Sequence, residues 1–298
     1  MTTVVGVRGG LSVDHLVDAG LGTRFDELGG PGLFGALGAR LVAGTQVQLY
    51  ARLPDDEPRF AKVFQELGID TSETMREPQA MRLWILNSPQ GRRILATSPS
   101  GSVEIEGTGT TEPDGDTGAG DSGEVPVTGG IDGLLDSSPT ERAAVAESVR
   151  VGVDPHQLPL QAEGPEYLLR VSPSGALVLP SRVQLQLIDP DPLAAARAIR
   201  ARLGFDVIAR LDREGMVVIS DSEWFVRDTD VRVVETTGAG DSSAGAIVAA
   251  WTAGADLATA AAYGVSVARL ALSDWGHAGL LADPLTEPFP SITITRRQ

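Results

Sequence analysis

The first part of the chain alternates between short β-branched runs and segments whose large apolar residues fall on one helical face. Residues 3–9 (TVVGVRG) form a β-branched run that ends in glycine, which predicts a first strand. Residues 29–44 open with a glycine turn and continue with leucine and phenylalanine at helical spacing. Residues 47–53 then predict a second strand, and residues 57–67 predict a helix with one apolar face.

A strand pair comes next, followed by a segment of a different kind. Residues 81–87 and 92–96 predict the two strands of a hairpin, which would form a small flap beside the main sheet. Residues 98–130 are rich in Gly, Thr, Ser, Asp and Glu, and no Lys or Arg occurs between Arg93 and Arg142. Such a segment cannot bury enough apolar surface to offset its ordering entropy, so we expect a long, mobile acidic loop.

The second half of the chain alternates regularly between strand and helix patterns. The pattern predicts helices at 139–149, 192–203, 239–253 and 256–272, and strands at 131–135, 150–154, 166–171, 175–179, 206–211, 215–219, 223–227 and 231–235. Strands that alternate with helices of this length indicate a mostly parallel sheet that is covered by helices on both faces. The expected fold class is therefore α/β.

Composition and charge narrow the classes of partner. The 298 residues carry a formal net charge of -16, which would repel a nucleic acid over most of the surface. The chain has no cysteine and only three histidines, which never stand at metal-ligand spacing, so a zinc site is not expected. No apolar run approaches the roughly 20 residues of a membrane span, and we expect a cytoplasmic protein.

The residues that indicate chemistry lie at 236–241, with the sequence Thr-Thr-Gly-Ala-Gly-Asp. A strand over 231–235 would lead into this turn, and the small-residue helix 239–253 would follow it. At the carboxyl end of a strand, glycines and a helix start aim N–H groups at one point, where an anion can bind. Asp241 would stand within reach of a hydroxyl held there and could accept its proton. The alternative is that Asp241 is a plain helix cap.

The sequence Thr-Gly-Ala-Gly-Asp-Ser, which spans residues 237–242, occurs a second time at residues 117–122, inside the acidic loop. No strand precedes this copy, no apolar helix follows it, and Asp114, Asp116 and Glu124 surround it. We therefore interpret it as part of the loop.

The turn at 236–241 resembles the second signature of the PfkB (ribokinase-like) family of carbohydrate and nucleoside kinases. The resemblance implies that Gly238, Ala239 and Gly240 form an anion hole for the transferred phosphoryl group and that Asp241 is the base.

The N-terminal part of the chain resembles the same family. Residues 10–14 (GLSVD) are similar to the exit from its first strand, where an aspartate, here Asp14, holds substrate hydroxyls. Gly29 and Gly30 resemble the di-glycine that approaches the substrate, and Phe34 stands where a further substrate contact is expected. Trp84 lies two residues from Arg82 on the predicted lid strand, so the two share one face and could cover the substrate; the alternative is that Trp84 packs the flap.

The resemblance also implies the architecture and the ligands. It predicts a single domain over residues 1–298, a ribokinase-like three-layer α/β/α sandwich with a small β lid at about 10–20 and 81–96. It implies ATP and Mg²⁺ as cofactors, with no metal-ligating residue assigned. The residues expected on the nucleotide side are Thr237, Asp212, Gly215 and His277.

Several positions depart from the family pattern. Phe34 replaces a substrate-binding asparagine. Ser181 and Gln184 replace the asparagine and glutamate of an Asn-x-x-Glu element that organises magnesium. The stretch Arg210–Asp212 stands in place of a nucleotide-binding Thr-Leu-Gly turn. These departures gather on the nucleotide and metal side.

Three functional hypotheses follow. The first is an ATP-dependent phosphotransferase that acts on a hydroxyl of a sugar or nucleoside-like compound. The second is a non-catalytic or regulatory ligand-binding descendant of the same fold, and the third is a kinase for a vitamin-precursor alcohol. A hairpin that is apolar on both faces also suits a homodimer formed through the lid.

Overall fold

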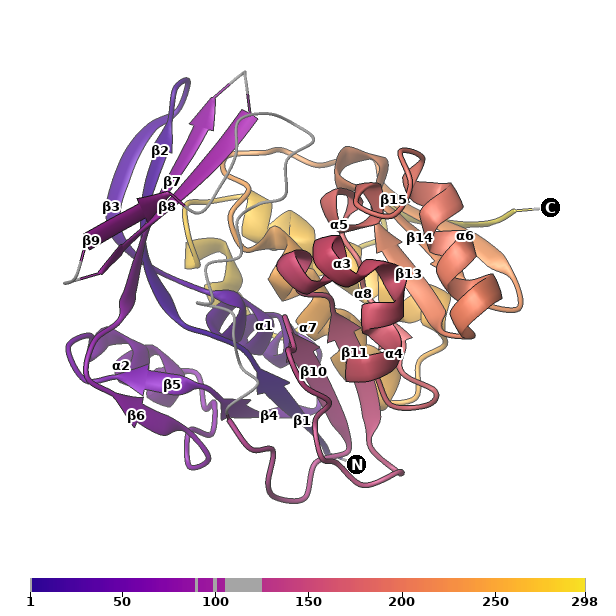
Figure 1. The fold of residues 1–298 in the computed structure, drawn as a ribbon, viewed down its shortest axis with the longest axis horizontal. Coiled ribbons are helices and arrows are strands. Elements are labelled where there is room, and N and C mark those ends of the chain that lie inside the picture. The colour runs from indigo at the N-terminus through magenta and orange to yellow at the C-terminus, as the bar shows by residue number, and fades with distance from the viewer. Residues whose placement is uncertain (1, 89–90, 99–100, 105–124, 298) are drawn as a thin grey trace.

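A nine-stranded sheet runs through the centre of the molecule (Figure 1). The computed structural model describes residues 2–88, 91–98, 101–104 and 125–297, so most of the predicted acidic loop and the second copy of the motif at 117–122 lie outside the described residues. In spatial order the strands are β4 (Thr45–Tyr50), β1 (Thr3–Arg8), β10 (Gly133–Ser137), β11 (Arg150–Asp154), β12 (Leu177–Val178), β13 (Asp206–Arg210), β14 (Met216–Ile219), β15 (Glu223–Asp228) and β16 (Ile292–Arg296). The first six are parallel and the last three antiparallel, as a mostly parallel sheet requires.

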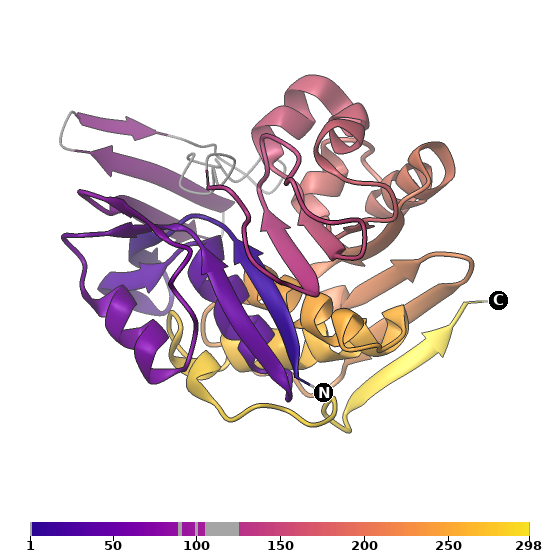
Figure 2. The same cartoon turned by 90° about the horizontal axis from the view of Figure 1, so that it is seen from below.

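Helices cover both faces of this sheet and complete a three-layer α/β/α sandwich (Figure 2). One face carries α1 (Pro31–Arg40), α7 (Ala239–Thr252) and α8 (Leu257–Leu272), and the other carries α3 (Gln157–Glu163), α4 (Tyr167–Val171), α5 (Arg182–Gln186) and α6 (Pro192–Leu203). Side chains alternate between the two layers along each strand. On β13, Ile208 packs into the core beneath α7, whereas Val207 and Ala209 pack into the core beneath α6.

A second, smaller sheet projects from one end of the molecule (Figure 1). Its strands, in spatial order, are β3 (Gly22–Gly29), β2 (Ser12–Asp18), β7 (Met81–Ser88), β8 (Gly91–Ser98) and β9 (Gly101–Glu104). The predicted hairpin forms β7 and β8, and β2 lies within the predicted strand at 10–20. Below this small sheet, β5 (Arg52–Pro54) pairs with β6 (Met75–Glu77) beside α2 (Arg59–Glu66), which buries Phe60 and Phe64.

The structure has no helix at residues 139–149, where the sequence pattern predicts one. Side chains distant in the sequence bind the carbonyls that a helix would use. The Arg8 guanidinium donates to the Glu141 carbonyl at 3.0 Å, and the Tyr167 hydroxyl donates to the Pro139 carbonyl. The prediction was wrong because these donors compete with the helical N–H groups for the same acceptors.

Two predicted strands are also absent from the described chain. Residues 166–171 form η1 (Gly164–Glu166) and α4, in which Tyr167, Leu168 and Val171 are buried on one side while Leu169 is exposed. This run is therefore apolar at helical spacing, which its short length concealed. Residues 231–235 form no strand, and Val233 is 54% exposed. The sequence pattern also missed β16, in the C-terminal tail.

Helices α1 and α7 approach each other closely at small residues. A Cβ on Gly38 would lie 1.9 Å from the Ser242 carbonyl oxygen, and a Cβ on Gly245 would lie 2.1 Å from the Gly35 carbonyl oxygen. The two backbones therefore touch along this line. The contact fixes the first turns of α7 against the middle and the last turn of α1.

A buried ion pair joins the carboxyl ends of β1 and β10. The Arg8 guanidinium donates two hydrogen bonds of 2.7 Å each to Asp136, and the two side chains are 4% and 1% exposed. We predict that Arg8→Met lowers the free energy of unfolding by about 3–5 kcal/mol, because it leaves the Asp136 carboxylate buried and unpaired. Urea denaturation measures this directly, and a loss below about 1 kcal/mol would contradict the prediction.

Candidate active site

The 236–241 turn opens α7, as the sequence predicts, but no strand leads into it. Residues 229–235 run as irregular chain from the end of β15, and the Val234 N–H donates to the Leu272 carbonyl of α8 at 2.7 Å. Gly238 then adopts a φ of +75°, a conformation that favours glycine. The first N–H groups of a helix have no acceptor within it, so this helix start can bind an anion without a preceding strand.

The Phe34 ring of α1 packs against the 236–241 turn at Gly238. A Cβ on Gly238 would lie 2.2 Å from Cδ1 of the Phe34 ring, and Phe34 is only 1% exposed. The ring therefore packs directly against the turn backbone. The predicted substrate contact through Phe34 gains no support from this burial, and neither does an apolar substrate inferred from it.

Asp14 lies beside the di-glycine that precedes α1. A Cβ on Gly29 would lie 1.9 Å from Oδ2 of Asp14, so a side chain at position 29 would displace the carboxylate. The Ser12 hydroxyl donates to Oδ1 of Asp14 at 2.7 Å. Gly30 has a φ of +91°, and a Cβ there would lie 2.6 Å from the Gly10 carbonyl oxygen. The structure therefore brings Asp14, Gly29 and Gly30 together at the start of α1.

Helix α1 connects the two halves of this region. Gly29 and Gly30 precede it, and its residue Phe34 touches Gly238. The Asp14 group and the 236–241 turn are therefore held by the same short helix. Asp241, in the first turn of α7, is partly exposed, and Gly240 is exposed.

A buried arginine lies against the turn from the other side. Arg210, at the end of β13, donates from Nη1 to the Gly240 carbonyl at 2.6 Å and from Nη2 to Oδ1 of Asp154 at 2.6 Å. Asp154 ends β11, and both side chains are under 10% exposed. The sequence pattern had not assigned Arg210 a role, although a charged residue that ends an otherwise apolar strand was a signal.

Ser181 and Gln184 are engaged with each other. The Ser181 N–H donates to Oε1 of Gln184 at 2.6 Å, and the Gln184 N–H donates to the Ser181 hydroxyl at 3.3 Å, which is a capping box at the start of α5. The Gln184 amide donates to the Pro155 carbonyl at 2.6 Å and to Asp154 at 3.3 Å.

This arrangement does not fit a protein-held Mg²⁺ at these two positions. Neither side chain offers a carboxylate, and their polar atoms are already bonded to one another or to neighbouring oxygens. Within the described part of the chain, no group of three or more histidine or carboxylate side chains could hold a metal ion. A divalent cation would therefore enter this site only together with a nucleotide.

The residues expected on the nucleotide side include Asp212 and Gly215, which form the turn after β13. This turn contains η2 (Asp212–Glu214), and Asp212 itself has a φ of +50°. Arg182 donates to Asp212 at 2.9 Å and to Glu214 at 2.7 Å, which offsets the two negative charges of this turn. A Cβ on Gly215 would lie 2.3 Å from the Val226 carbonyl oxygen, so a glycine is needed for β15 to pass.

Thr237 is tied to a buried carboxylate. Its N–H and its hydroxyl both donate to Oε1 of Glu235, at 2.7 and 2.6 Å, and Glu235 is 3% exposed. The Thr237 hydroxyl is thus committed inside the protein. Its backbone N–H is committed to the same carboxylate, so a contact of Thr237 with a nucleotide stays a prediction.

Trp84 lies on the opposite face of the small sheet from Asp14. In the pairing of β2 with β7, Asp14 is level with Leu83 and His15 is level with Trp84. Neighbouring residues of a strand point to opposite faces, so Leu83 shares the Asp14 face, and Trp84 packs on His15 with ring centroids 4.6 Å apart. The prediction that Trp84 contacts the same substrate as Asp14 is therefore not supported by its place in the sheet.

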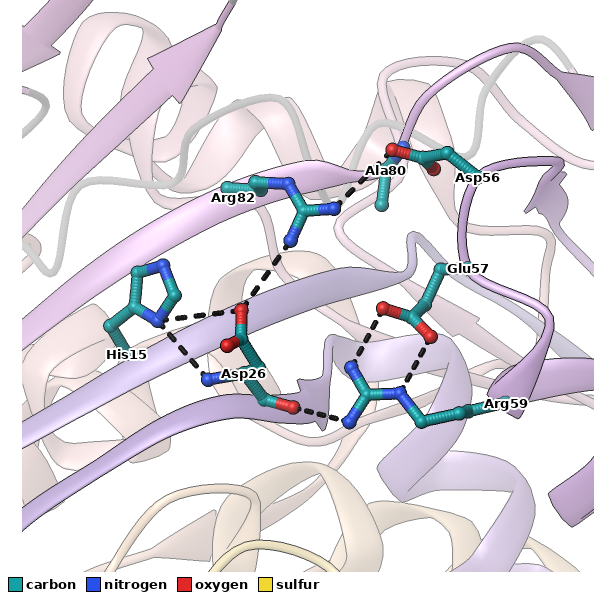
Figure 3. A network of polar contacts seen from close by, with 7 residues as sticks. All are labelled: His15, Asp26, Asp56, Glu57, Arg59, Ala80 and Arg82. Carbon is teal, nitrogen blue, oxygen red and sulfur yellow. Dashed lines mark hydrogen bonds and ion pairs between the residues drawn. The ribbon is translucent and has the colours of Figure 1, made fainter.

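The face that carries Trp84 is tied to the segment before α2. Figure 3 shows Arg82 and His15 pointing toward Asp26, and Arg59 reaching the same residue from α2. Arg59 donates to the Asp26 carbonyl at 2.7 Å and makes two hydrogen bonds to Glu57, of 2.6 and 2.7 Å. These contacts hold the small sheet by the face that is turned away from Asp14.

His277 lies between the end of α8 and the small-sheet side of the molecule. Its neighbour Gly276 approaches Glu27 of β3, and burial, with a smaller effect from Arg59, lowers the pKa of His277 below its usual 6.5. Its Nδ1 is buried without a hydrogen-bond partner among the described residues. A contact of His277 with a nucleotide stays a prediction.

The lowered pKa of His277 predicts a pH effect on stability. At a pH between the lowered pKa of folded His277 and its unfolded value of about 6.5, the unfolded chain binds more protons than the folded one. This difference costs no stability above about pH 6.5, and the free energy of unfolding falls as the pH decreases below it. We expect the free energy of unfolding to fall more steeply from about pH 7 to 5 in the wild type than in His277→Gln. Urea denaturation at several pH values tests this, and equal slopes would refute it.

Comparisons with known proteins agree with this architecture. Residues 183–281, from α5 to η3 (Ala278–Leu281), match the family described as pfkB family carbohydrate kinase. A search of curated proteins finds no match. Across the described chain, no helix is both long and apolar enough to cross a membrane.

Solved structures match over nearly the whole chain. The ribokinase of Cryptococcus neoformans var. grubii serotype A in complex with ADP has a TM-score of 0.70 and 16% identity, covering 96% of this chain and 98% of that one. Aminoimidazole riboside kinase from Salmonella enterica, complexed with aminoimidazole riboside and an ATP analog, has a TM-score of 0.70 and 22% identity over 95% and 97% of the two chains. Fructokinase from Vibrio cholerae O395 has a TM-score of 0.66 and 16% identity over 94% and 96%. The chain therefore has the fold of the ribokinase-like kinases over nearly its whole length, and its residues 183–281 match the pfkB carbohydrate kinase family.

Proposed function

We propose that this protein is an ATP-dependent phosphotransferase that acts on a hydroxyl group of a sugar or nucleoside-like small molecule. The observation that carries the proposal is the pairing of two features by α1. The helix holds Asp14 and the di-glycine at its start, and through Phe34 it supports the turn that carries Asp241. A hydroxyl-binding carboxylate and an anion-binding helix start are the two parts that such a reaction needs.

In the proposed reaction, Asp14 accepts hydrogen bonds from substrate hydroxyls. Asp241 accepts the proton of the reacting hydroxyl while its oxygen forms a bond to the γ-phosphorus of ATP. The bond from that phosphorus to the β–γ bridging oxygen breaks, and ADP leaves. The N–H groups at Gly238–Gly240 stabilise the negative charge on the transferring group. ATP enters as its magnesium complex, and no step depends on a metal held by the protein.

The similar solved structures support ATP as the phosphoryl donor. One was solved with ADP and another with an ATP analog beside a riboside substrate. The Asp212–Gly215 turn, with its charges offset by Arg182, is the part of this chain that we propose for the nucleotide.

A second candidate is a sugar- or nucleoside-binding descendant without catalytic activity. The specific observation in its favour is the capping box in which Ser181 and Gln184 bond to each other. The side chains at the two positions expected to organise magnesium are therefore engaged within the protein. The vitamin-precursor alternative loses its basis, because Phe34 is buried under Gly238. A homodimer through the small sheet stays a proposal, supported by Leu21 and Phe25, each 56% exposed.

One screen separates the two candidates. Sugars, nucleosides and vitamin alcohols are each incubated with the protein and MgATP, and ADP release is followed alongside calorimetric binding. Acceptor-dependent ADP release supports the phosphotransferase. Binding of a sugar or nucleoside without ADP release in any case would support the non-catalytic candidate instead.

A further inference from the structure

Arg210 is the most completely buried cation that touches the proposed anion site. It is 7% exposed, and its guanidinium contacts the site through the Gly240 carbonyl at 2.6 Å. Its Nε is buried and has no hydrogen-bond partner among the described residues. A Cβ on Gly240 would lie 3.4 Å from Nη1, an ordinary van der Waals distance, so the guanidinium lies directly against the turn.

The ion pair of Arg210 with Asp154 is oriented. Nη2 faces Asp154 at 2.6 Å, while Nη1 faces Gly240, so the positive end of the pair lies on the side of the turn. Inside a protein, where the effective dielectric is low, a fixed charge in this position acts on a bound anion more strongly than it would in water.

Gln184 fits this pair as a glutamate would not. Its amide donates to Asp154 at 3.3 Å and to the Pro155 carbonyl at 2.6 Å. A carboxylate at position 184 would face two oxygen atoms without a proton to give them. The amide at 184 and the arginine at 210 therefore form one arrangement, in which a guanidinium rather than a carboxylate-bound metal provides the positive charge.

We propose that Arg210 is the fixed cation of this site, which positions the 238–241 turn through the Gly240 carbonyl and attracts the phosphate groups of the nucleotide to it. The inference rests on the proposed phosphoryl transfer for its biological meaning. It makes Arg210 a positioning residue, and it supplies a positive charge that serine at 181 and glutamine at 184 would not organise through a metal.

Because Arg210 and Asp154 carry opposite charges, removing each of them should change the affinity for phosphate in opposite directions. We titrate ADP and inorganic phosphate, without divalent cation, into the wild type, Arg210→Met, Arg210→Lys and Asp154→Asn by calorimetry. Arg210→Met should weaken binding about ten- to hundredfold, the range expected for the loss of a charged hydrogen-bond partner. Arg210→Lys keeps the charge but cannot bridge both partners, so its affinity should lie in between. Asp154→Asn removes the opposing charge and should tighten binding.

Arg8→Met is the matched control for this series. Arg8 is as deeply buried as Arg210 and is also paired with an aspartate, but its contacts lie on Asp136 and Glu141. Arg8→Met should lose stability while its affinity for phosphate stays at the wild-type level. If Arg210→Met does not fold, Arg210→Lys and Asp154→Asn still carry the test.

Three results would overturn the inference. They are an Arg210→Met variant with wild-type affinity, an Asp154→Asn variant that weakens binding as Arg210→Met does, and a wild type that binds neither ADP nor phosphate. These binding results do not depend on turnover. A wild type that binds ADP in the expected order of variants but phosphorylates no acceptor would defeat the proposed function and leave the role of Arg210 intact.

Discussion

Asp241→Asn should lower kcat by about 10³-fold, while the affinity for the acceptor stays within a few-fold of the wild type. The asparagine keeps the size and hydrogen-bonding shape of the side chain at the start of α7, but it cannot accept a proton. The measurement is steady-state ADP release with the acceptor found by screening, together with calorimetric titration of that acceptor. Asp241→Asn turnover within a few-fold of the wild type would remove Asp241 from the reaction.

Asp256→Asn provides the control. Asp256 stands at the start of the neighbouring helix α8, where its carboxylate accepts the Thr259 N–H at 2.7 Å as an ordinary helix cap. Asparagine is an equally good cap, so Asp256→Asn should leave both stability and turnover unchanged. If Asp241 were only a cap, the two variants would behave alike.

Gly238→Ala should lower kcat/KM by about a hundredfold, because the turn must move to accommodate the new side chain. The Cβ would lie 2.2 Å from the Phe34 ring, and the backbone φ of +75° is itself unfavourable for alanine. Both effects shift the N–H groups that are proposed to meet the transferring phosphoryl group. The measurement is kcat/KM together with the free energy of unfolding.

Gly254→Ala separates strain from displacement. Gly254 has a φ of +101°, but a Cβ there would meet nothing within 4 Å. This variant should lose about 1–2 kcal/mol of stability from the backbone conformation and keep its activity. Wild-type kcat/KM in Gly238→Ala, or an equal activity loss in Gly254→Ala, would contradict the placement of the turn.

The sequence predicted those parts of the fold in which local pattern and tertiary packing agree. Helices α1, α6, α7 and α8 and the parallel strands have enough apolar residues at one period to be identified. The segment at 139–149 failed because Arg8 and Tyr167, far away in the sequence, bind its carbonyls. A pattern read from residues 139–149 alone cannot predict hydrogen bonds from side chains so distant in the sequence.

The backbone geometry of the candidate site is the part that the sequence could predict. At Gly29, Gly30 and Gly238 a neighbouring group of the protein occupies the place that a Cβ would take. Only glycine fits there, so a short sequence motif is enough to identify these positions. Which face Trp84 occupies could not be predicted locally, because it depends on the pairing of β7 with β2. Arg210 was missed because its role depends on two residues from other elements, Asp154 and Gly240.

Transfer of a phosphoryl group at the 238–241 turn is tested most directly with ATP labelled on its γ-phosphate. The protein is incubated with this ATP and the best acceptor from the screen, and the label is followed. We expect the label to appear in the acceptor with the wild type and not with Asp241→Asn. Label that stays out of every acceptor with the wild type, or that appears equally with both proteins, would contradict this expectation.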